Sequence, residues 1–307
     1  MKTPPSERLP AAGPPRQAVL ILNPVAGRGR ARKREPAVLQ ALCSAGMRVE
    51  LLETEAPGHA TELARRAHRE GAELIIAAGG DGTVHEVAQG VWGTDAVLGV
   101  LPLGSGNDFA TSHRIPRDLE AAARVLTGGP VRVTDVGRFG DRAYFNTMGI
   151  GFTVEVTAQS RRLKRLRGIP LYLAAVMKSF ASYASIPLEI ETPGFHRERP
   201  TYFITVAIGV CEGGGFHLTP DALTDDGLFD VCIVDHVSTP TALRILPRAL
   251  KGTHTGHETV TMLRVPTIRI SAPHDIFVHA DGQLYDTGRD TLVCTCERGA
   301  LRVRVPG

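Results

Sequence analysis

Hydrophobic positions in the first 130 residues follow two alternating periods. Short uninterrupted apolar runs are typical of buried strands, and between them apolar residues recur at helical spacing and stop at glycines. The expected strands are Ala18–Leu22, Arg48–Leu52, Leu74–Ala78 and Val97–Leu101, and the expected helices are Ala31–Ala45, Ala60–Glu70, the segment from residue 83 to Val91, and Leu119–Leu126. Strands that alternate with helices predict a parallel sheet with helices on both faces.

After about residue 130 the pattern changes to short β-rich runs separated by turn residues, which favours an antiparallel sandwich. The expected strands are Val131–Val136, Ala143–Met148, Tyr202–Val210, Leu228–Val234, Thr267–Ser271, Ile276–His279, Thr291–Cys296 and Leu301–Val305. Two helical stretches, Glu155–Ser182 and Thr239–Lys251, interrupt them. The sequence therefore predicts a Pro-rich disordered lead-in over residues 1–17, an α/β domain over 18–131 and a β-sandwich domain over 132–298.

Composition narrows the class of protein. A length of 307 residues agrees with two domains, and 35 basic against 32 acidic residues leave a net charge of +3, too small to indicate a nucleic-acid partner. No apolar run approaches the ~20 residues of a membrane span, and the N-terminus has no apolar core of a secretory signal. Five cysteines without a CxxC pair predict reduced thiols in a cytoplasmic protein.

Three glycine-rich loops follow predicted strands of the first domain: Asn23–Gly27, Gly79–Thr83 and Leu103–Asp108. In a parallel sheet, ligands bind at the carboxyl ends of the strands, glycines let the backbone approach a phosphate, and helix N-termini attract anions. Asp81 can contact Mg²⁺ or a ribose, and Thr83 a phosphate oxygen; a tight turn capped by Asp81 is the alternative. The chain has no GxxxxGK[ST] loop, so it is not a P-loop NTPase, and the lack of a clean GxGxxG after a strand argues against an ordinary Rossmann dinucleotide site.

These motifs, taken in order, resemble a known family. NPVAG at 23–27, GGDGT at 79–83 and LPLGSGNDFA at 101–110 are followed by EGGGF at 212–216, TPDAL at 219–223, DDGL at 225–228, APHDI at 272–276, ADGQ at 280–283 and GALRV at 299–303. The set is similar to the diacylglycerol kinase-like lipid kinases, which include sphingosine kinases and bacterial YegS-type enzymes. GGDGT alone is shared with NAD kinases and phosphofructokinases, whereas the ordered set spans residues 18–306.

The resemblance implies ATP- and Mg²⁺-dependent transfer of the γ-phosphate to a hydroxyl of a lipid such as diacylglycerol. It places the ATP site at Asn23, Pro24, Gly27, Thr54, Gly79, Gly80, Asp81, Gly82, Thr83, Ser105 and Asn107, and Glu86 is added for its proximity on the next helix. Ser105 stands where the family usually has Thr, and the hydroxyl is kept. Asp226 and the carbonyls of Leu223 and Leu228 match the family's Mg²⁺ site, although a surface turn is the alternative. The resemblance also implies that the last strand, within 299–307, returns to the first domain.

One departure concerns the chemistry. The family's Asp-Gly-Glu supplies a glutamate proposed as general base, and here the triplet is Asp281-Gly282-Gln283. A neutral amide can orient a hydroxyl but cannot accept its proton at neutral pH. Either Asp81, Asp281 or Asp286 takes the proton, or a loose transition state needs little base, or the protein binds nucleotide or lipid without turnover. An active kinase is the first interpretation, with Asp81, Asp281 and Gln283 as catalytic candidates.

A basic stretch, Arg161–Arg167, precedes the apolar segment Ile169–Phe180. Cations beside an apolar helix can hold anionic headgroups, so we expect peripheral contact of a cytoplasmic enzyme with a membrane surface. A solvated basic helix packed on the sandwich is the alternative. A soluble-substrate kinase of the NAD kinase type is the rival function, and a homodimer is left open.

Overall fold

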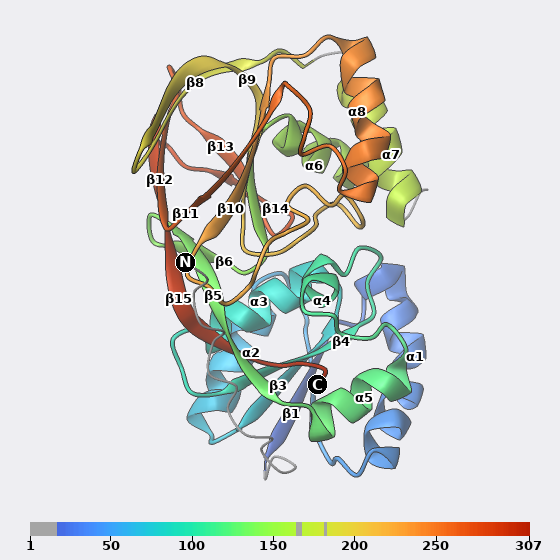
Figure 1. Ribbon diagram of the computed structural model, residues 1–307. Helices are drawn as coiled ribbons and strands as arrows, with labels where there is room; N and C mark the ends of the chain where they lie inside the picture. Colours follow the sequence, from blue (N-terminus) through green and yellow to red (C-terminus); the bar gives the residue numbers. More distant parts are fainter. Residues whose placement is uncertain (1–16, 164–167, 181–182) are drawn as a thin grey trace. The chain divides into compact units, whose positions relative to one another are not determined.

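The computed structural model describes residues 17–163, 168–180 and 183–307 (Figure 1). Residues 1–16 of the predicted lead-in and residues 164–167 of the basic stretch lie outside this part. The chain divides into two compact units: unit 1 comprises the chain up to Asp135 together with Arg298–Gly307, and unit 2 comprises Val136–Glu297. The division at Asp135 and the boundary predicted near residue 131 both fall within one strand, Val131–Phe139.

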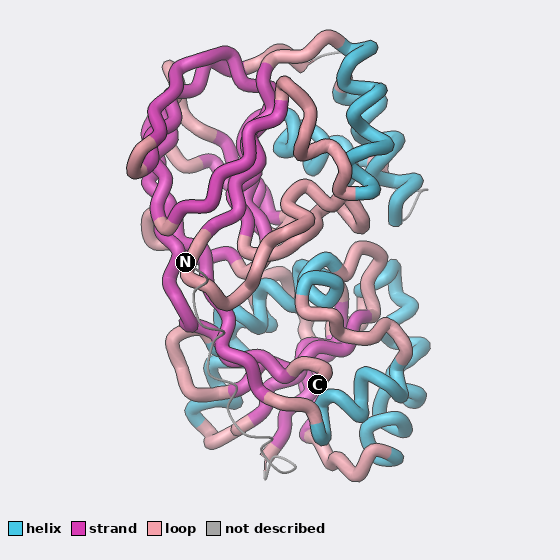
Figure 2. Tube along the Cα trace, in the orientation of Figure 1, coloured by secondary structure: helices cyan, strands magenta, loops and turns pink. Residues whose placement is uncertain are grey.

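Unit 1 is built on a parallel sheet. Its strands are β1 (Ala18–Leu22), β2 (Glu50–Glu53), β3 (Leu74–Gly79) and β4 (Val97–Pro102), in the order β4-β3-β1-β2. All neighbours run parallel, and the end of β15 (Thr291–Arg304) joins β4 in parallel through Arg302 and Val303. Figure 2 shows strands and helices alternating along this part of the chain. The predicted α/β class is confirmed.

Helices cover both faces of this sheet. Successive strand residues point to opposite faces, and in β1 and β3 the residues on both faces are apolar and buried. The unit 1 helices are α1 (Ala26–Ser44), α2 (His59–Arg69), α3 (Asp81–Val91), α4 (Asp108–Ser112) and α5 (Leu119–Gly128). Leu20, Leu22 and Ile76 pack with α1 and α5 in one core. The alternate residues Ile21 and Ile75 are also fully buried, on the side where α2 and α3 pack on the sheet.

Unit 2 is β-rich and antiparallel, as predicted. Its strands are β5 (Val131–Phe139), β6 (Arg142–Tyr144), β7 (Thr147–Gly151), β8 (Ile186–Thr192), β9 (Phe195–Ala207), β10 (Phe229–Asp235), β11 (Val260–Val265), β12 (Thr267–Ser271), β13 (Phe277–Ala280) and β14 (Gln283–Asp286). The hydrogen-bonded order is β14-β13-β7-β9-β8-β12-β15, with β10 between β9 and β11.

Three helices cover one face of the strands around β10. They are α6 (Phe152–Arg162), α7 (Gly168–Ser179) and α8 (Thr239–Lys251). Cys232 and Val234 on β10 pack in the same core as these helices, whereas Val231 and Ile233 pack in a core made by strands alone. The period-two pattern of β10 therefore separates two apolar layers.

Several element boundaries differ from the prediction for identifiable reasons. The strand predicted at Ala143–Met148 is two strands, because the amides of Phe145 and Asn146 donate to the Asp281 carboxylate instead of to a neighbouring strand. The two strands predicted at 291–296 and 301–305 are one, since the N–H of Gly299, at φ +64°, donates to Asp135 and the chain continues. Strands β8, β11 and β14 were not predicted, although the apolar residues of β8 alternate with polar ones as in a half-buried strand.

Candidate active site

The three glycine-rich loops of unit 1 meet at one edge of its sheet. They follow β1, β3 and β4, which run parallel, so all three lie at the carboxyl edge. The side-chain amide of Asn23 donates to the Thr83 hydroxyl at 3.0 Å, which joins the first loop to the second. The N–H of Leu103 donates to the carbonyl of Gly79 at 2.8 Å, which joins the third loop to the second. The three loops predicted to cradle phosphate thus lie together, and their binding of phosphate stays a prediction.

Close backbone contact explains the glycines in these loops. A Cβ built on Gly104 would lie 2.4 Å from the Cα of Gly80, and one built on Gly79 would lie 2.3 Å from the Thr83 hydroxyl. A Cβ on Gly27 would lie 3.1 Å from the Leu103 carbonyl oxygen. The second and third loops therefore touch through their main chains at Gly80 and Gly104, and Gly27 lets the first loop approach the carbonyl of Leu103.

Asp81 holds the second and third loops together. As the first residue of α3, it accepts the N–H of Asn107 at Oδ2 (2.7 Å) and the N–H of Phe109 at Oδ1 (3.3 Å). Asn107, at φ +60°, closes its own loop by hydrogen-bonding both the N–H and the carbonyl of Gly104. The carboxylate thus fixes the loop over the start of α4. The predicted contacts of Asp81 with Mg²⁺ or a transferred proton stay predictions.

Other predicted nucleotide residues divide into two groups. Thr54 donates its N–H to the Leu22 carbonyl at 2.9 Å and so lies beside the first loop, and Ser105 is half-buried within the third. Glu86 instead accepts the N–H of Ala60 at 3.2 Å, at the start of α2, whose own cap residue Gly58 has no side chain. The structure therefore shows Glu86 as a cap of α2, and its contact with nucleotide stays a prediction.

In unit 2, the side-chain carboxylate of Asp281 fixes the Asp281-Gly282-Gln283 turn. Asp281 accepts three main-chain N–H groups, from Phe145 at 2.8 Å, Asn146 at 2.9 Å and Thr147 at 3.1 Å. Its φ of +48° belongs to the left-handed region, as expected for the first residue of a tight hairpin turn. These contacts make Asp281 a clamp for the turn, and its role as proton acceptor stays a prediction.

Gln283 contacts Arg161, the first residue of the basic stretch that was predicted to bind a membrane surface. Its side-chain oxygen accepts Nη2 of Arg161 at 2.9 Å, and the same nitrogen donates to the Gly282 carbonyl at 2.8 Å. A glutamate at this position would form an ion pair with Arg161, whereas glutamine forms a neutral hydrogen bond. Arg161 thus orients the side-chain amide of Gln283.

The predicted Mg²⁺ residues lie beside two groups that the sequence analysis missed. Asp226 accepts the N–H of Leu228 at 3.1 Å and forms an ion pair with Arg264. Asp230 is buried beside them: the backbone of Leu223 hydrogen-bonds its carboxyl, and Arg264 Nε lies 3.5 Å from Oδ1. Burial raises the pKa of Asp230 to about 6, and Arg264 opposes the rise. Asp230 on β10 and Arg264 on β11 are direct partners across the two strands, and this pairing became visible only in the fold.

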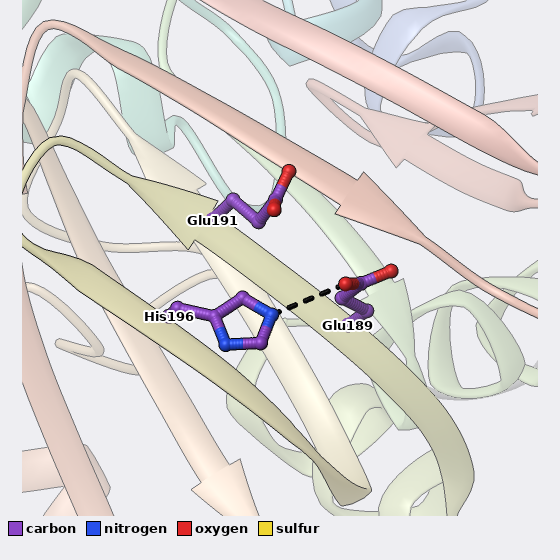
Figure 3. Close-up of side chains that lie close together, drawn as sticks. All are labelled: Glu189, Glu191 and His196. Atoms are coloured by element: carbon purple, nitrogen blue, oxygen red, sulfur yellow. Dashed lines mark hydrogen bonds and ion pairs between the residues drawn. The ribbon is translucent and has the colours of Figure 1, made fainter.

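A group of three further potential metal ligands lies on the β8–β9 hairpin (Figure 3). His196 Nε2 lies 3.1 Å from Glu189 Oε1, and Glu191 forms an ion pair with Arg269 at 3.6 Å. Glu189 and Glu191 are partly exposed, and the His196 side chain is 60% exposed. Each of these three side chains has an interaction partner within the protein, and we assign them no ligand.

Fold and site together define a two-unit phosphotransferase. A family model described as "Diacylglycerol kinase catalytic domain" matches residues 17–139, and one described as "YegS C-terminal NAD kinase beta sandwich-like domain" matches residues 146–305. The chain therefore belongs to the diacylglycerol kinase family of lipid kinases. The resemblance inferred from the motifs is confirmed.

Individual relatives agree with this assignment. A Pseudomonas fluorescens protein named "Probable lipid kinase YegS-like" is 34% identical over 95% of this chain and 96% of its own. A Bacillus subtilis protein named diacylglycerol kinase is 32% identical over 87% of this chain and 90% of its own. A crystal structure of a diacylglycerol kinase from Bacillus anthracis has the same fold, with a TM-score of 0.72 at 21% identity over 95% of this chain and 97% of that one.

Proposed function

We propose that this protein transfers the γ-phosphate of ATP, with Mg²⁺, to a hydroxyl of a lipid such as diacylglycerol. The observation that carries the proposal is the convergence of three glycine-rich loops at the carboxyl edge of the unit 1 sheet. Family membership supports phosphoryl transfer, and the names of the relatives support a lipid acceptor. The nucleotide phosphates would lie against the loops around Asn23, Gly80 and Gly104.

The site suits phosphoryl transfer because that reaction depends on positioning and on stabilising negative charge. The first turn of α3 has no side-chain cap, and the positive end of the helix dipole there would attract an anion. Asp81 keeps the third loop in place through two main-chain hydrogen bonds. Unit 2 would bind the acceptor lipid. Asp281 and Gln283 would shape the turn that faces the acceptor hydroxyl.

The residues predicted for Mg²⁺ fit a hard cation. Asp226 and the carbonyls of Leu223 and Leu228 would hold it, and Asp230 adds a carboxylate whose Oδ2 has no hydrogen-bond partner among the described residues. Carboxylate and carbonyl oxygens are the ligands that Mg²⁺ prefers. An ion held by these residues would supply positive charge that can neutralise phosphate oxygens. Arg264, 46% exposed, would release Asp226 to the ion and rotate toward solvent.

Asp226→Asn should remove this Mg²⁺ site. Mg²⁺ without nucleotide is expected to raise the melting temperature of the wild-type protein, because an ion that binds only the folded state stabilises it. The variant should lose most of this rise, corresponding to a Kd weakened by about tenfold or more. Differential scanning fluorimetry over a Mg²⁺ titration measures it, with Asp275→Asn, an exposed aspartate elsewhere in unit 2, as the control. An equal Mg²⁺ response in Asp226→Asn and wild type would place the ion elsewhere.

Mass spectrometry tests the function itself. A native bacterial lipid extract is incubated with the protein, ATP and Mg²⁺, and we expect lipids that gain one phosphoryl group. Phosphorylation of NAD with none of any lipid would instead establish the soluble-substrate rival. Nucleotide binding without turnover on either acceptor would establish a silent relative.

We further propose that unit 2 contacts an anionic membrane surface through α7. Leu173 and Met177, one helical turn apart, are 37% and 49% exposed, and Lys178 lies beside them. Among the described residues, no helix has the length and apolarity to cross a bilayer, so the contact would be peripheral. Arg162, at the end of α6, is exposed and adds a cation. Apolar side chains beside cations suit insertion among anionic headgroups.

Replacing Leu173 and Met177 together by glutamate should weaken vesicle binding at least about fivefold, because apolar burial is lost and like charges repel. Co-sedimentation with phosphatidylglycerol–phosphatidylcholine vesicles measures the change. Val293→Glu, at a 40% exposed apolar position on β15, is the matched control and should bind as wild type does. Equal binding by the double variant would remove α7 from the membrane contact.

A further inference from the structure

A cluster of polar side chains lies on the unit 2 sheet beside the Asp281-Gly282-Gln283 turn. The Glu212 cluster consists of Glu212, His279, Thr205, Thr147 and Thr153. His279 on β13 and Thr205 on β9 both pair with Gly149 on β7, which lies between them, so the two side chains share one face of the sheet. Glu212 enters this face from the short hairpin it closes with Phe216. All of these residues belong to unit 2.

Contacts within the cluster centre on the Glu212 carboxyl. Its Oε1 lies 3.6 Å from His279 Nε2, and its Oε2 accepts the Thr205 hydroxyl at 3.4 Å. The Thr147 hydroxyl also hydrogen-bonds it. The Glu212 side chain is 14% exposed, so it is largely desolvated but still reaches solvent. A small polar ligand can therefore approach it.

Two neighbours of Glu212 have unused hydrogen-bonding capacity. Among the described residues, neither ring nitrogen of His279 nor the hydroxyl of Thr153 has a hydrogen-bond partner, although these residues are only 3% and 7% exposed. A Cβ on Gly149 would lie 2.3 Å from both His279 Nε2 and Thr153 Oγ1, so glycine lets these groups converge. Buried polar groups without partners are unfavourable unless a ligand satisfies them. A hydroxyl, which both donates and accepts, suits this position.

The carboxylates of the neighbouring turn are less suited to receive a proton. Asp281 accepts three main-chain N–H groups, Gln283 is neutral, and Asp286 is exposed at the far end of β14, where it accepts the N–H of Gly288. Thr147 connects the turn to Glu212, because its N–H donates to Asp281 while its hydroxyl bonds Glu212. Glu212 therefore approaches the same turn from another strand.

We propose that Glu212 accepts the proton of the acceptor hydroxyl, in place of the glutamate that this chain lacks at position 283. The proposal rests on the proposed function. The O–H bond of the lipid hydroxyl breaks and its proton passes to a Glu212 carboxylate oxygen. The hydroxyl oxygen forms the new P–O bond, the bond between the γ-phosphorus and the β–γ bridging oxygen breaks, and ADP leaves with that electron pair.

Protonation equilibria in the cluster agree with this role. Burial raises the pKa of Glu212 to about 7, and the hydroxyls of Thr205 and Thr147 oppose the rise. Burial lowers the pKa of His279 to about 4, against the effect of Asp281, so the ring is neutral and acts by hydrogen bonding. Burial also raises the pKa of the Cys232 thiol, the other titratable group facing Glu212, so it stays neutral. A base with a pKa near neutrality is well matched to proton transfer.

Glu212→Gln, which keeps the shape of the protonated side chain, tests the proposal. Wild-type kcat should fall as the pH drops below about 7, where Glu212 becomes protonated. The variant should lose about 100-fold or more in kcat at pH 8 and lose this pH dependence, with little change in KM for ATP. Glu189→Gln, in the exposed Glu189–His196 pair of the same unit, is the matched control and should leave kcat and its pH profile unchanged. A Glu212→Gln enzyme with kcat within about threefold of wild type and the same pH profile overturns the proposal.

Substitution at position 283 gives a second, independent test. Gln283→Glu alone should change kcat only a few-fold, because a base is already present, and in the Glu212→Gln background it should restore a large part of the lost rate. A rise of about 100-fold in the single variant would mean that wild type has no base, and would overturn the assignment even if Glu212→Gln failed to fold. A wild-type protein without turnover on any lipid overturns the proposed function, and with it the role of Glu212.

Melting curves verify that Glu212 titrates in the folded protein. The pKa of Glu212 in the folded protein lies above its ordinary value of 4.5. Its contribution to the free energy of unfolding is therefore complete below pH 4.5 and is lost as the pH rises through about 7. Glu212→Gln should therefore raise the melting temperature at pH 8 but not at pH 4.5. An equal shift at both pH values would contradict an ionisable Glu212 and overturn its assignment as the base.

Discussion

Gly104→Ala is expected to reduce kcat/KM for ATP by about 100-fold or more, which corresponds to roughly 3 kcal/mol of lost binding and transition-state stabilisation. The added Cβ would lie 2.4 Å from the Cα of Gly80 and 2.8 Å from the Asn107 side-chain oxygen. The first of these atoms belongs to main chain and cannot rotate away, so the second and third loops must separate. Separated loops no longer place their main-chain groups around one phosphate.

Equilibrium binding of ATP and steady-state kinetics measure this effect. Gly128→Ala is the matched control, because no atom lies within 4 Å of a Cβ at that position, at the end of α5. It should bind ATP as wild type does and be equally or slightly more stable, since alanine favours helix. A Gly104→Ala protein that binds ATP within about threefold of wild type would show that the loop contact does not form the phosphate site.

Asp281→Asn is expected to destabilise unit 2 by about 2–4 kcal/mol. The carboxylate accepts three main-chain N–H groups, and the amide replaces one accepting oxygen by a donor that faces a donor. Backbone strain is not the cause, because asparagine tolerates the φ of +48° at this position. Loss of the clamp should also loosen the turn that carries Gln283.

The distribution of aromatic residues lets this prediction be assigned to one unit. The single tryptophan, Trp92, lies in unit 1, whereas all five tyrosines lie in unit 2. In urea denaturation, the tyrosine near-ultraviolet dichroism should shift to lower urea more than the tryptophan fluorescence does. Asp286→Asn, at the exposed end of the same hairpin, should shift neither signal by more than about 0.5 kcal/mol. Unchanged tyrosine dichroism in Asp281→Asn would contradict the clamp.

Sequence patterns predicted the architecture of unit 1 in most of its detail. Buried strands such as Leu74–Gly79 are continuous apolar runs. The helices that follow glycine-rich turns are recognised by apolar residues that recur at helical spacing. The start of α1 was placed five residues late, at Ala31 instead of Ala26, because Gly27 and Gly29 resemble a loop and adopt positive φ within its first turns. The convergence of the three glycine-rich loops was predictable because the carboxyl ends of the strands in a parallel sheet all lie at the same edge.

The contacts that define the unit 2 site were not predictable, because they join residues distant in sequence. Asp281 clamps Phe145 across 136 positions, and no local pattern marks such a partner. Glu212 appeared in a glycine-rich motif but was not singled out, since only the fold brings it to His279 and Thr147. Burial and partner geometry, which change the chemistry of a carboxyl group, are properties of the tertiary structure.

The most direct test of lipid kinase activity is to determine which acceptor receives the γ-phosphate of ATP. Purified protein is incubated with γ-labelled ATP and Mg²⁺, and diacylglycerol in mixed micelles and NAD are offered in the same reaction. The account predicts that label appears in phosphatidic acid, that Gly104→Ala abolishes it and that Gly128→Ala does not. Label that appears in phosphorylated NAD, or only as free phosphate, would contradict it.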